Sequence, residues 1–309
     1  MSASHQLYAD FCHRHALPLH FQAWWLDAVS QNGSWHVAFF GEAQGQPQAA
    51  LPWYETRRFG LKTIRPAPFT AYGGPIWLPQ PAGQRPDRRY AFEQKALENL
   101  HQQLPRTWHF RQHWQPAYYN WLPLYWKKYK QETRYTYLLN QQNEAALWAG
   151  LKNTVRTDIR KAQEQVEVLS GPEYVETGYA LYRQSAGRKG FDVGRLHDTF
   201  RALHTELDQR GHATCFLARD RRNGEPHAAL YLTHDAQRAG LLWSGLSAAH
   251  RHSCAGHLLL FEALRFAFAR GIQTFDFEGS MDPGIEHLYR SFGGTLTPYF
   301  SLYYSKILT

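Results

Sequence analysis

The order of predicted elements between residues 241 and 294 constrains the fold of this chain more than any other feature. Apolar residues there alternate with a two-residue period in some segments and recur with a helical period in others. The segment and its surroundings predict a strand at 239–245 and, after a loop, a long helix at 255–270. A strand at 273–278, a short helix at 285–291 and a strand at 295–304 follow. Elements mixed in this order pack as layers, which predicts an α/β (α+β) fold.

The rest of the chain indicates a duplicated organisation. Both halves of the 309 residues have helices first, then strands, then a helix, and no short repeat is visible. Strands at 213–220, 228–235 and 239–245 follow one another directly, as in a meander. We therefore expect two tandem domains, 1–145 and 146–309, each a mixed, mostly antiparallel sheet flanked by helices, with the final strand free to pack back on the first domain.

Composition excludes several classes of protein. Hydrophobic residues make up 43% and charged residues 19% of the chain, which excludes a disordered chain, a coiled coil and a small disulfide scaffold. Three widely spaced cysteines without a CxxC pair predict neither a metal site nor a disulfide framework. Residues 1–15 differ from a signal peptide, and Glu262 and Arg265 interrupt the most apolar helix. We expect a cytoplasmic protein without stable membrane insertion.

The net charge of +8 is unevenly distributed. Residues 1–150 hold 15 Lys and Arg against 9 Asp and Glu, a net of +6, and residues 151–309 hold 19 against 17, a net of +2. A basic chain usually meets an anionic partner. Lys152, Arg156 and Arg160 form one stripe on a predicted helix, which is either a solvated face or a contact for phosphates of a nucleotide-linked substrate or RNA.

Other basic residues have open interpretations. Arg188 and Lys189 lie between two helices and either hold an anionic group of a substrate or end a helix favourably. The loop with Tyr72 and Gly73 either lines a cleft or simply joins two strands. Basic residues interleaved with aromatic ones at 121–130 either stack on bases or sugars or form ordinary surface.

Two carboxylates mark the strand at 273–278. Its alternation places Phe275 and Phe277 on one face and Asp276 and Glu278 on the other. Buried charge is costly, so these acids need a reason to be there. They act as a general base, hold a substrate amine, or form structural ion pairs, and Asp276 is favoured for function because it lies deeper in the strand.

The segment 241–294 resembles the core of the GNAT acyltransferases. In that family, two parallel strands splay apart and the acyl donor lies between them, with its pyrophosphate at the N-terminus of the long helix. The family signature Arg/Gln-x-x-Gly-x-Gly/Ala corresponds to residues 251–256 here, which makes donor-binding candidates of Arg251, Ser253, Cys254, Ala255 and Gly256. Cys254 replaces the middle glycine, and a plain helix start with Ser253 as cap is the alternative. Leu288–Gly293 resembles the segment whose tyrosine, here Tyr289, protonates the leaving thiolate.

Two segments resemble the FemAB-like branch of this superfamily, the peptidoglycan-bridge aminoacyltransferases and their relatives. The first is residues 152–162, and the second is residues 275–280 together with residues 289–294. The resemblance implies two tandem GNAT-like domains with the donor cleft mostly in the second. Tyr289 stands where the bridge enzymes have a lysine, which brings the site nearer to acyl-CoA enzymes.

The sequence thus predicts an N-acyltransferase that moves an acyl or aminoacyl group from an activated thioester or ester to an amine. Its co-substrate is acyl-CoA or aminoacyl-tRNA, and no metal is expected. One alternative is a tRNA-dependent transferase that acts on the amine of a peptidoglycan precursor. The other is a non-catalytic GNAT-like binding module.

Overall fold

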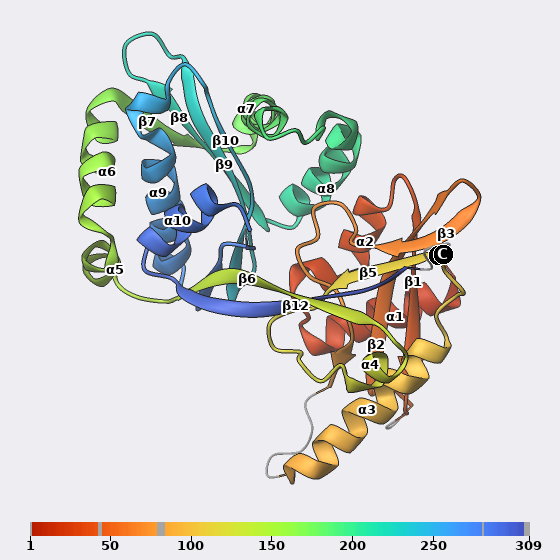
Figure 1. Ribbon diagram of the computed structural model, residues 1–309. Coiled ribbons are helices and arrows are strands. Elements are labelled where there is room, and N and C mark those ends of the chain that lie inside the picture. Colours follow the sequence, from red (N-terminus) through yellow and green to blue (C-terminus); the bar gives the residue numbers. More distant parts are fainter. Residues whose placement is uncertain (1, 43–44, 79–83, 280, 306–309) are drawn as a thin grey trace. The chain divides into compact units, whose positions relative to one another are not determined.

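The chain divides into two compact units. The computed structural model describes residues 2–42, 45–78, 84–279 and 281–305 (Figure 1). Unit 1 comprises Met1–Arg134 and Pro298–Thr309, and unit 2 comprises Tyr135–Thr297. The sequence had suggested a division after residue 145, whereas the units divide within the strand β6 (Lys130–Asn140). A second strand, β12 (Thr295–Ser305), also belongs partly to each unit.

Unit 1 is covered by helices on both faces of its sheet. Before β6, its elements in chain order are α1 (Ala3–His15), η1 (Leu19–Phe21), α2 (Ala23–Val29), β1 (Ser34–Phe40), β2 (Ala49–Arg58), β3 (Leu61–Arg65), β4 (Ile76–Trp77), α3 (Pro86–Gln102), β5 (His109–His113) and α4 (Leu122–Trp126). The strand order is β1-β2-β3-β5-β12. The short β4 lies off this path and pairs with the beginning of β2, at Ala49 and Ala50. One apolar core lies under α1 and α2, and another lies under α3 and α4. Successive residues of β2, such as Ala50 and Leu51, enter opposite cores, because side chains of a strand point alternately to its two faces.

Unit 2 has the same kind of layered arrangement. After β6 its elements are α5 (Glu144–Gly150), α6 (Asn153–Gln165), β7 (Val166–Ser170), η2 (Pro172–Tyr174), α7 (Val175–Arg188), η3 (Gly194–Leu196), α8 (His197–Gln209), β8 (Ala213–Asp220), β9 (Pro226–His234), β10 (Arg238–Leu246), η4 (Arg251–Ser253), α9 (Ala255–Ala269), β11 (Thr274–Asp276) and α10 (Pro283–Ser291). The strand order is β6-β11-β10-β9-β8-β7, antiparallel except for β10 and β11.

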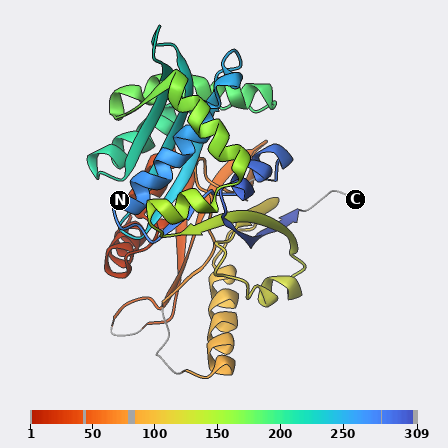
Figure 2. The same cartoon turned by 90° about the vertical axis from the view of Figure 1, so that its left-hand side faces the viewer.

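Helices α9 and α6 pack together on one face of this sheet, and α7 and α8 lie on the other (Figure 1). Figure 2 shows α6 and α9 side by side in front of the strands. Apolar residues of α9 occupy most of its turns, because the helix contacts both the sheet and α6. This burial of apolar surface is the main stabilising term of the unit.

Two glycines bring α7 very close to the sheet. A Cβ at Gly178 would lie 3.0 Å from the Trp243 ring and 3.1 Å from Ala229. At Gly245, a Cβ would overlap the backbone of α7 at Leu181 and Tyr182. The end of β10 is therefore held directly against a helix backbone.

The elements predicted between residues 213 and 304 agree with those observed, apart from the end of one strand. In unit 1, the sequence pattern does not predict β3, β4 or α4. The strand predicted at 273–278 is wrong at its end, because β11 stops at Asp276 and Glu278 has a left-handed backbone with φ of 56°. Ser280, part of the family-like segment, lies outside the described residues.

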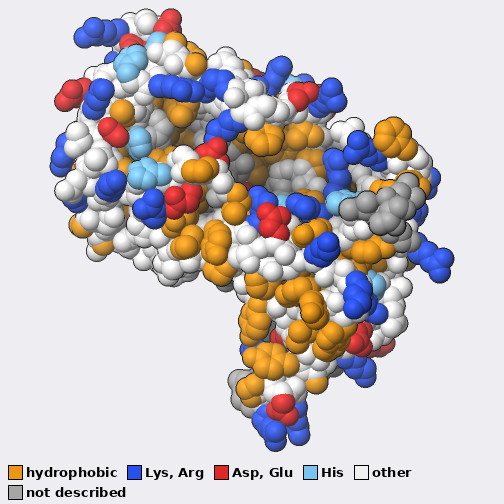
Figure 3. Space-filling model, viewed as in Figure 1, with side chains coloured by type: hydrophobic (Ala, Val, Ile, Leu, Met, Phe, Trp, Pro, Cys, Tyr) orange, Lys and Arg blue, Asp and Glu red, His pale blue; other side chains and the backbone are white. Residues whose placement is uncertain are grey.

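Basic side chains do not form one continuous patch on the face drawn in Figure 3. Lys and Arg are spread over both units there, interspersed with acidic and hydrophobic side chains. Exposed hydrophobic residues of unit 1 include Tyr119, Leu122, Tyr125 and Trp126, at and beside α4. No helix within the described ranges is long and apolar enough to cross a membrane.

The close approach at Gly245 is testable. We expect Gly245→Ala to lower the free energy of unfolding by at least about 2 kcal/mol, because the added methyl group meets backbone atoms that cannot move independently. The control is Gly187→Ala in the last turn of α7, where a Cβ has no neighbour within 4 Å and alanine favours the helix. Equal urea midpoints for Gly245→Ala and the parent chain would contradict this packing.

Candidate active site

Strands β10 and β11 separate shortly after they begin. They pair only over Arg238–Gly240 and Thr274–Asp276. Beyond Gly240, β10 continues to pair with β9 as far as Leu246, and its register shifts by one residue between Leu241 and Trp243. The chain after β11 instead stays with β6, since the Phe277 amide donates to the Tyr137 carbonyl at 3.1 Å. A bulge re-aims the strand that carries it, so the two parallel strands open into a splay.

Asp276 lies at the start of this splay and has hydrogen-bond partners. Its Oδ1 accepts from the Thr136 hydroxyl at 2.6 Å and from the Glu278 amide at 2.8 Å. The first bond ties β11 to β6, and the second fixes the backbone turn after β11. The Asp276 carboxylate thus accepts two hydrogen bonds that hold β6, β11 and the following turn together.

Glu278 differs from Asp276 in its surroundings. Its carboxyl fills the space above Gly240, where a Cβ would overlap Oε1 and would lie 3.3 Å from the Thr233 hydroxyl oxygen. No described residue gives this carboxyl a hydrogen bond or an ion pair. Burial, followed by the negative charge of Asp276, raises the pKa of Glu278 to about 8. A half-buried carboxyl with such a pKa and no fixed partner can accept a proton near neutral pH.

Tyr289 on α10 lies close enough to Asp276 and Glu278 to interact with their charges. Its ring packs against Phe277 with centroids 4.7 Å apart, and the side chain is 8% exposed. Burial, then the charges of Glu278 and Asp276, raise the pKa of Tyr289 well above its ordinary value. The phenol therefore stays protonated at neutral pH and can donate a proton. The structure thus brings together Asp276, Glu278 and Tyr289.

The predicted donor loop leads into α9. Cys254 is the N-cap of the helix and has a left-handed backbone, with φ of 58° and ψ of 19°. Glycine adopts this conformation freely, which explains why the family signature has glycine there. Ser253 is not the cap residue itself, but its buried hydroxyl accepts from the Ala255 amide at 3.4 Å and donates to the His250 carbonyl at 2.8 Å.

Space at the first turn of α9 is limited. A Cβ at Gly256 would lie 2.9 Å from a methyl group of Leu246, so glycine keeps the helix start close to the end of β10. The first amides of a helix carry partial positive charge and bind anions. Arg251 is exposed and forms no ion pair with a described residue, which leaves it free to meet an anion.

Neighbouring histidines are engaged elsewhere. His250 stacks on His227 with ring centroids 4.0 Å apart, and its Nε2 lies 3.1 Å from a Glu225 carboxylate oxygen. These contacts fix the loop after β10 to the turn between β8 and β9. They also direct His250 away from a role as base at the splay.

The end of α7 adjoins the ends of β10 and α10. Arg188 donates to the Leu246 carbonyl at 2.7 Å, and Lys189 forms an ion pair with Asp282, the N-cap of α10, at 3.1 Å. A cavity of about 650 Å³ is lined by α7 and the loop that follows it, and Arg188 and Lys189 are not among its lining residues. Its lining residues include Arg183, Gln184, Gly187, Gly190, Phe191 and Asp192.

The basic stripe on α6 has intramolecular partners. Arg156 donates to the carbonyls of Trp148 and Ala149, at 3.4 Å each, and also to Asn153. Arg160 lies over the Trp148 ring, 5.2 Å from its centroid. Both cations therefore interact with the C-terminal end of α5, where the helix dipole is negative. Lys152 is exposed.

Tyr72 and Gly73 lie in unit 1. Tyr72 is buried and packs edge-on against Tyr299, and the Gly73 amide donates to the His113 carbonyl at 2.6 Å. They line a cavity of about 40 Å³, large enough for a few water molecules. Buried polar atoms without a hydrogen-bond partner among the described residues line the same cavity, on Trp53, Tyr54, Gln112 and His113.

Sequence reasoning missed the supporting residues of the splay. Thr136 and Gly240 carry no motif, and each becomes significant only through a strand pairing. Depth in the strand favoured Asp276 over Glu278, but their different surroundings depend on the Thr136 hydrogen bond and on the left-handed backbone at Glu278, which the sequence does not indicate.

The comparisons with known proteins agree with this geometry. Residues 149–287, all within unit 2, match the family described as an acetyltransferase (GNAT) domain. A comparison with curated proteins found no match.

Two solved structures have a similar fold over nearly the whole chain. FemX is 13% identical, with 97% of this chain and 96% of FemX covered at a TM-score of 0.66. A tandem GNAT protein from the clavulanic acid biosynthesis pathway is 12% identical, with 97% and 92% covered at 0.54. The chain thus has the fold of the FemAB-like branch of the GNAT superfamily, and the predicted fold class is confirmed.

The raised pKa of Glu278 predicts a pH-dependent stability. The folded state favours the protonated carboxyl, so its contribution is full below the unfolded pKa of about 4.5 and is lost as pH rises through about 8. Glu278→Gln removes this loss, and we expect it to raise the free energy of unfolding by about 2 kcal/mol at pH 9, after discounting for partial exposure, and to change little at pH 4.

Urea unfolding at both pH values measures the difference. Glu164→Gln, on the exposed face of α6, is the matched control and should change stability equally at pH 4 and pH 9. An equal shift for Glu278→Gln at the two values would show that Glu278 titrates normally.

Proposed function

We propose that unit 2 transfers an acyl group from a thioester donor of the acyl-CoA type to an amine. The observation that carries this proposal is the Glu278 carboxyl, without a fixed partner, at the splay of two parallel strands and within electrostatic reach of Tyr289. A neutral proton donor and a carboxyl with a pKa near neutrality are the two groups that amine acylation needs.

The donor would lie with its pyrophosphate at the N-terminus of α9 and its acyl group in the splay. Arg251 and the first amides of the helix supply positive potential for the phosphates. Beyond Gly240, β10 no longer pairs with β11, and the backbone groups freed there would hydrogen-bond the donor's pantetheine amides. The engagement of Arg156 and Arg160 with α5 favours this compact donor over a tRNA, which would need a free basic surface.

The reaction follows from these positions. The amine nitrogen attacks the thioester carbonyl carbon while Glu278 takes a proton from the nitrogen, directly or through one water molecule. The carbon–sulfur bond then breaks, and Tyr289 gives its proton to the leaving thiolate. The products are an amide and a free thiol, and the proton on Glu278 restores the balance by way of solvent. Alignment of the two substrates supplies much of the rate.

The acceptor would enter beside the end of α7. The cavity of about 650 Å³ and the cations Arg188 and Lys189 suit an amine that also carries a carboxylate or phosphate. A peptidoglycan precursor has these groups, and FemX is the similar fold that suggests this class of acceptor.

The experiment is a transfer assay with acetyl-CoA and a panel of amines, followed by release of free thiol. We expect kcat/KM to rise with pH and to level above about 8, because Glu278 must be deprotonated to act. Glu278→Gln should lower the rate 10²- to 10⁴-fold, in the range usual for a general base. Asp276→Asn should move the acid limb to lower pH, since it removes a charge that raises the pKa of Glu278.

Other donors and other functions are outcomes of the same assay. Transfer from aminoacyl-tRNA alone, with salt-sensitive tRNA binding, would replace the acyl-CoA proposal. The absence of turnover with every donor, together with no thermal shift by acetyl-CoA, would favour a binding module.

A second variant tests the proton donor. Tyr289→Phe keeps the ring that packs against Phe277 and should lower kcat at least about tenfold while leaving the melting temperature within a few degrees. Tyr174→Phe in η2 is the matched control and should leave kcat unchanged. Unchanged turnover of Tyr289→Phe would exclude Tyr289 as the acid.

A further inference from the structure

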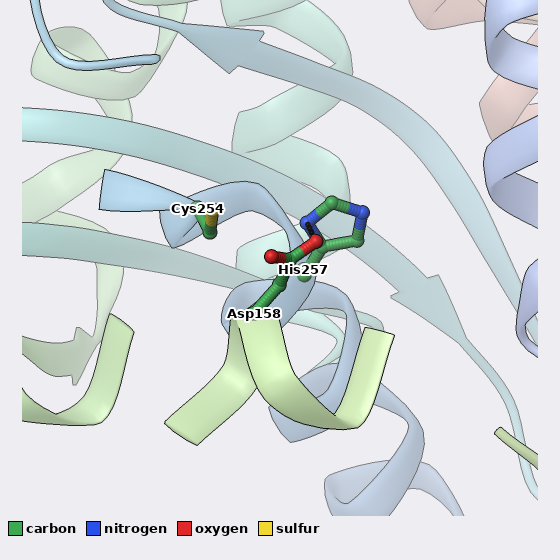
Figure 4. Close-up of side chains that lie close together, drawn as sticks. All are labelled: Asp158, Cys254 and His257. Atoms are coloured by element: carbon green, nitrogen blue, oxygen red, sulfur yellow. Dashed lines mark ion pairs between the residues drawn. The ribbon is translucent and has the colours of Figure 1, made fainter. Parts of the chain in front are cut away.

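Three potential metal ligands meet where α6 packs against the start of α9. Asp158 lies on α6, Cys254 caps α9, and His257 lies in its first turn (Figure 4). One ligand atom from each residue lies within 4.8 Å of the others. His257 Nδ1 is 3.5 Å from an Asp158 carboxylate oxygen, and all three residues are half-buried.

We propose that Asp158, Cys254 and His257 bind one divalent zinc ion between α6 and α9. A thiolate, an imidazole and a carboxylate are ordinary zinc ligands, and around a tetrahedral ion their donor atoms lie about 3.3–3.8 Å apart. The observed spacing needs only side-chain adjustment to reach that value. Three protein ligands leave a fourth position for water or an anionic oxygen, as in sites that keep an exchangeable ligand.

Two of the ligands lie at the start of α9. Cys254 is the N-cap, with a left-handed backbone, and His257 follows three residues later in the first turn, with its ligand atom within 4.8 Å of the Cys254 sulfur. The Phe292 ring lies nearly parallel to the His257 ring, with centroids 6.4 Å apart. Asp158 approaches from the neighbouring helix, which orients the carboxylate toward both residues.

The electrostatics favour a cation at this point. Asp158 is a negative charge beside the proposed phosphate loop, where it would repel an anionic donor unless a cation intervened. Without metal, burial and then Asp158 raise the pKa of Cys254, and burial lowers the pKa of His257. Zinc binds the thiolate form of cysteine, so zinc binding would release the thiol proton of Cys254.

The test uses the full chain without bound metal and Zn²⁺ alone, so its outcome does not depend on transfer activity. We expect one tight site by isothermal titration and a higher melting temperature with zinc, because the ion binds only the folded chain. Co²⁺ in place of Zn²⁺ should give a thiolate-to-metal absorption band and the strong visible bands of tetrahedral cobalt.

Variants locate the site. Cys254→Gly should weaken zinc binding at least about 100-fold and abolish the thiolate band, and it should fold well because glycine suits the left-handed backbone. His257→Gln and Asp158→Asn should also weaken binding. Matched controls are Cys215→Ala, a buried cysteine on β8, and His252→Gln, an exposed histidine in the same loop, both of which should bind zinc as the parent chain does.

Two results would overturn the proposal. One is equal zinc affinity in the parent chain and in Cys254→Gly, which would assign binding to other histidines. The other is the absence of a cobalt–thiolate band in the parent chain, which would leave the cluster as a helix-capping ion pair.

Discussion

The separation of β10 from β11 beyond Gly240 is the feature on which the proposed site depends. Two forces compete there: backbone pairing would keep the strands together, and the bulge between Leu241 and Trp243 turns β10 away. Tight packing of Gly245 against α7 holds β10 in its course, and the Phe277 amide holds the other chain to β6. Polar backbone groups that a closed sheet would satisfy are thereby left for a bound molecule.

Asp276 and Glu278 are only two residues apart, yet this arrangement gives them different properties. Neighbouring carboxyl groups in active sites often differ in pKa for the same reason, because their environments differ. Asp276 gains two hydrogen bonds and serves as an acceptor that holds the turn. Glu278 gains none from the described residues, and burial together with its charged neighbour shifts its pKa toward neutrality. In the proposed reaction, Asp276 holds the turn and Glu278 takes the proton.

The sequence predicted most helices and strands because their hydrophobic periods are long and regular, as in α9 and β8–β10. It missed β3 because Phe59 and Gly60 form the connecting turn with positive φ at both, and Phe59 is an unusual residue there. It missed α4 because only five residues, one of them Pro123, form the helix. Local patterns contain little information on such short elements.

The candidate site was predictable only in part. Motif resemblance identified Asp276, Glu278, Tyr289 and the loop at 251–256. It favoured Asp276 over Glu278 from depth in the strand alone, whereas the preference for Glu278 rests on the bond between Asp276 and Thr136, which is 140 residues away. It could not indicate the cluster at α9, since Asp158 joins Cys254 and His257 only through helix packing. Contacts between distant segments are what a single sequence leaves open.

The most direct test of the account is a carbon-13 NMR titration of the Glu278 side-chain carboxyl, assigned by comparison with Glu278→Gln. The account predicts a midpoint near pH 8 in the free protein, displaced downward in Asp276→Asn. A midpoint near 4.5, the ordinary value for glutamate, would contradict it, because a carboxylate already ionised and well solvated at neutral pH has no special capacity to take a proton from an amine.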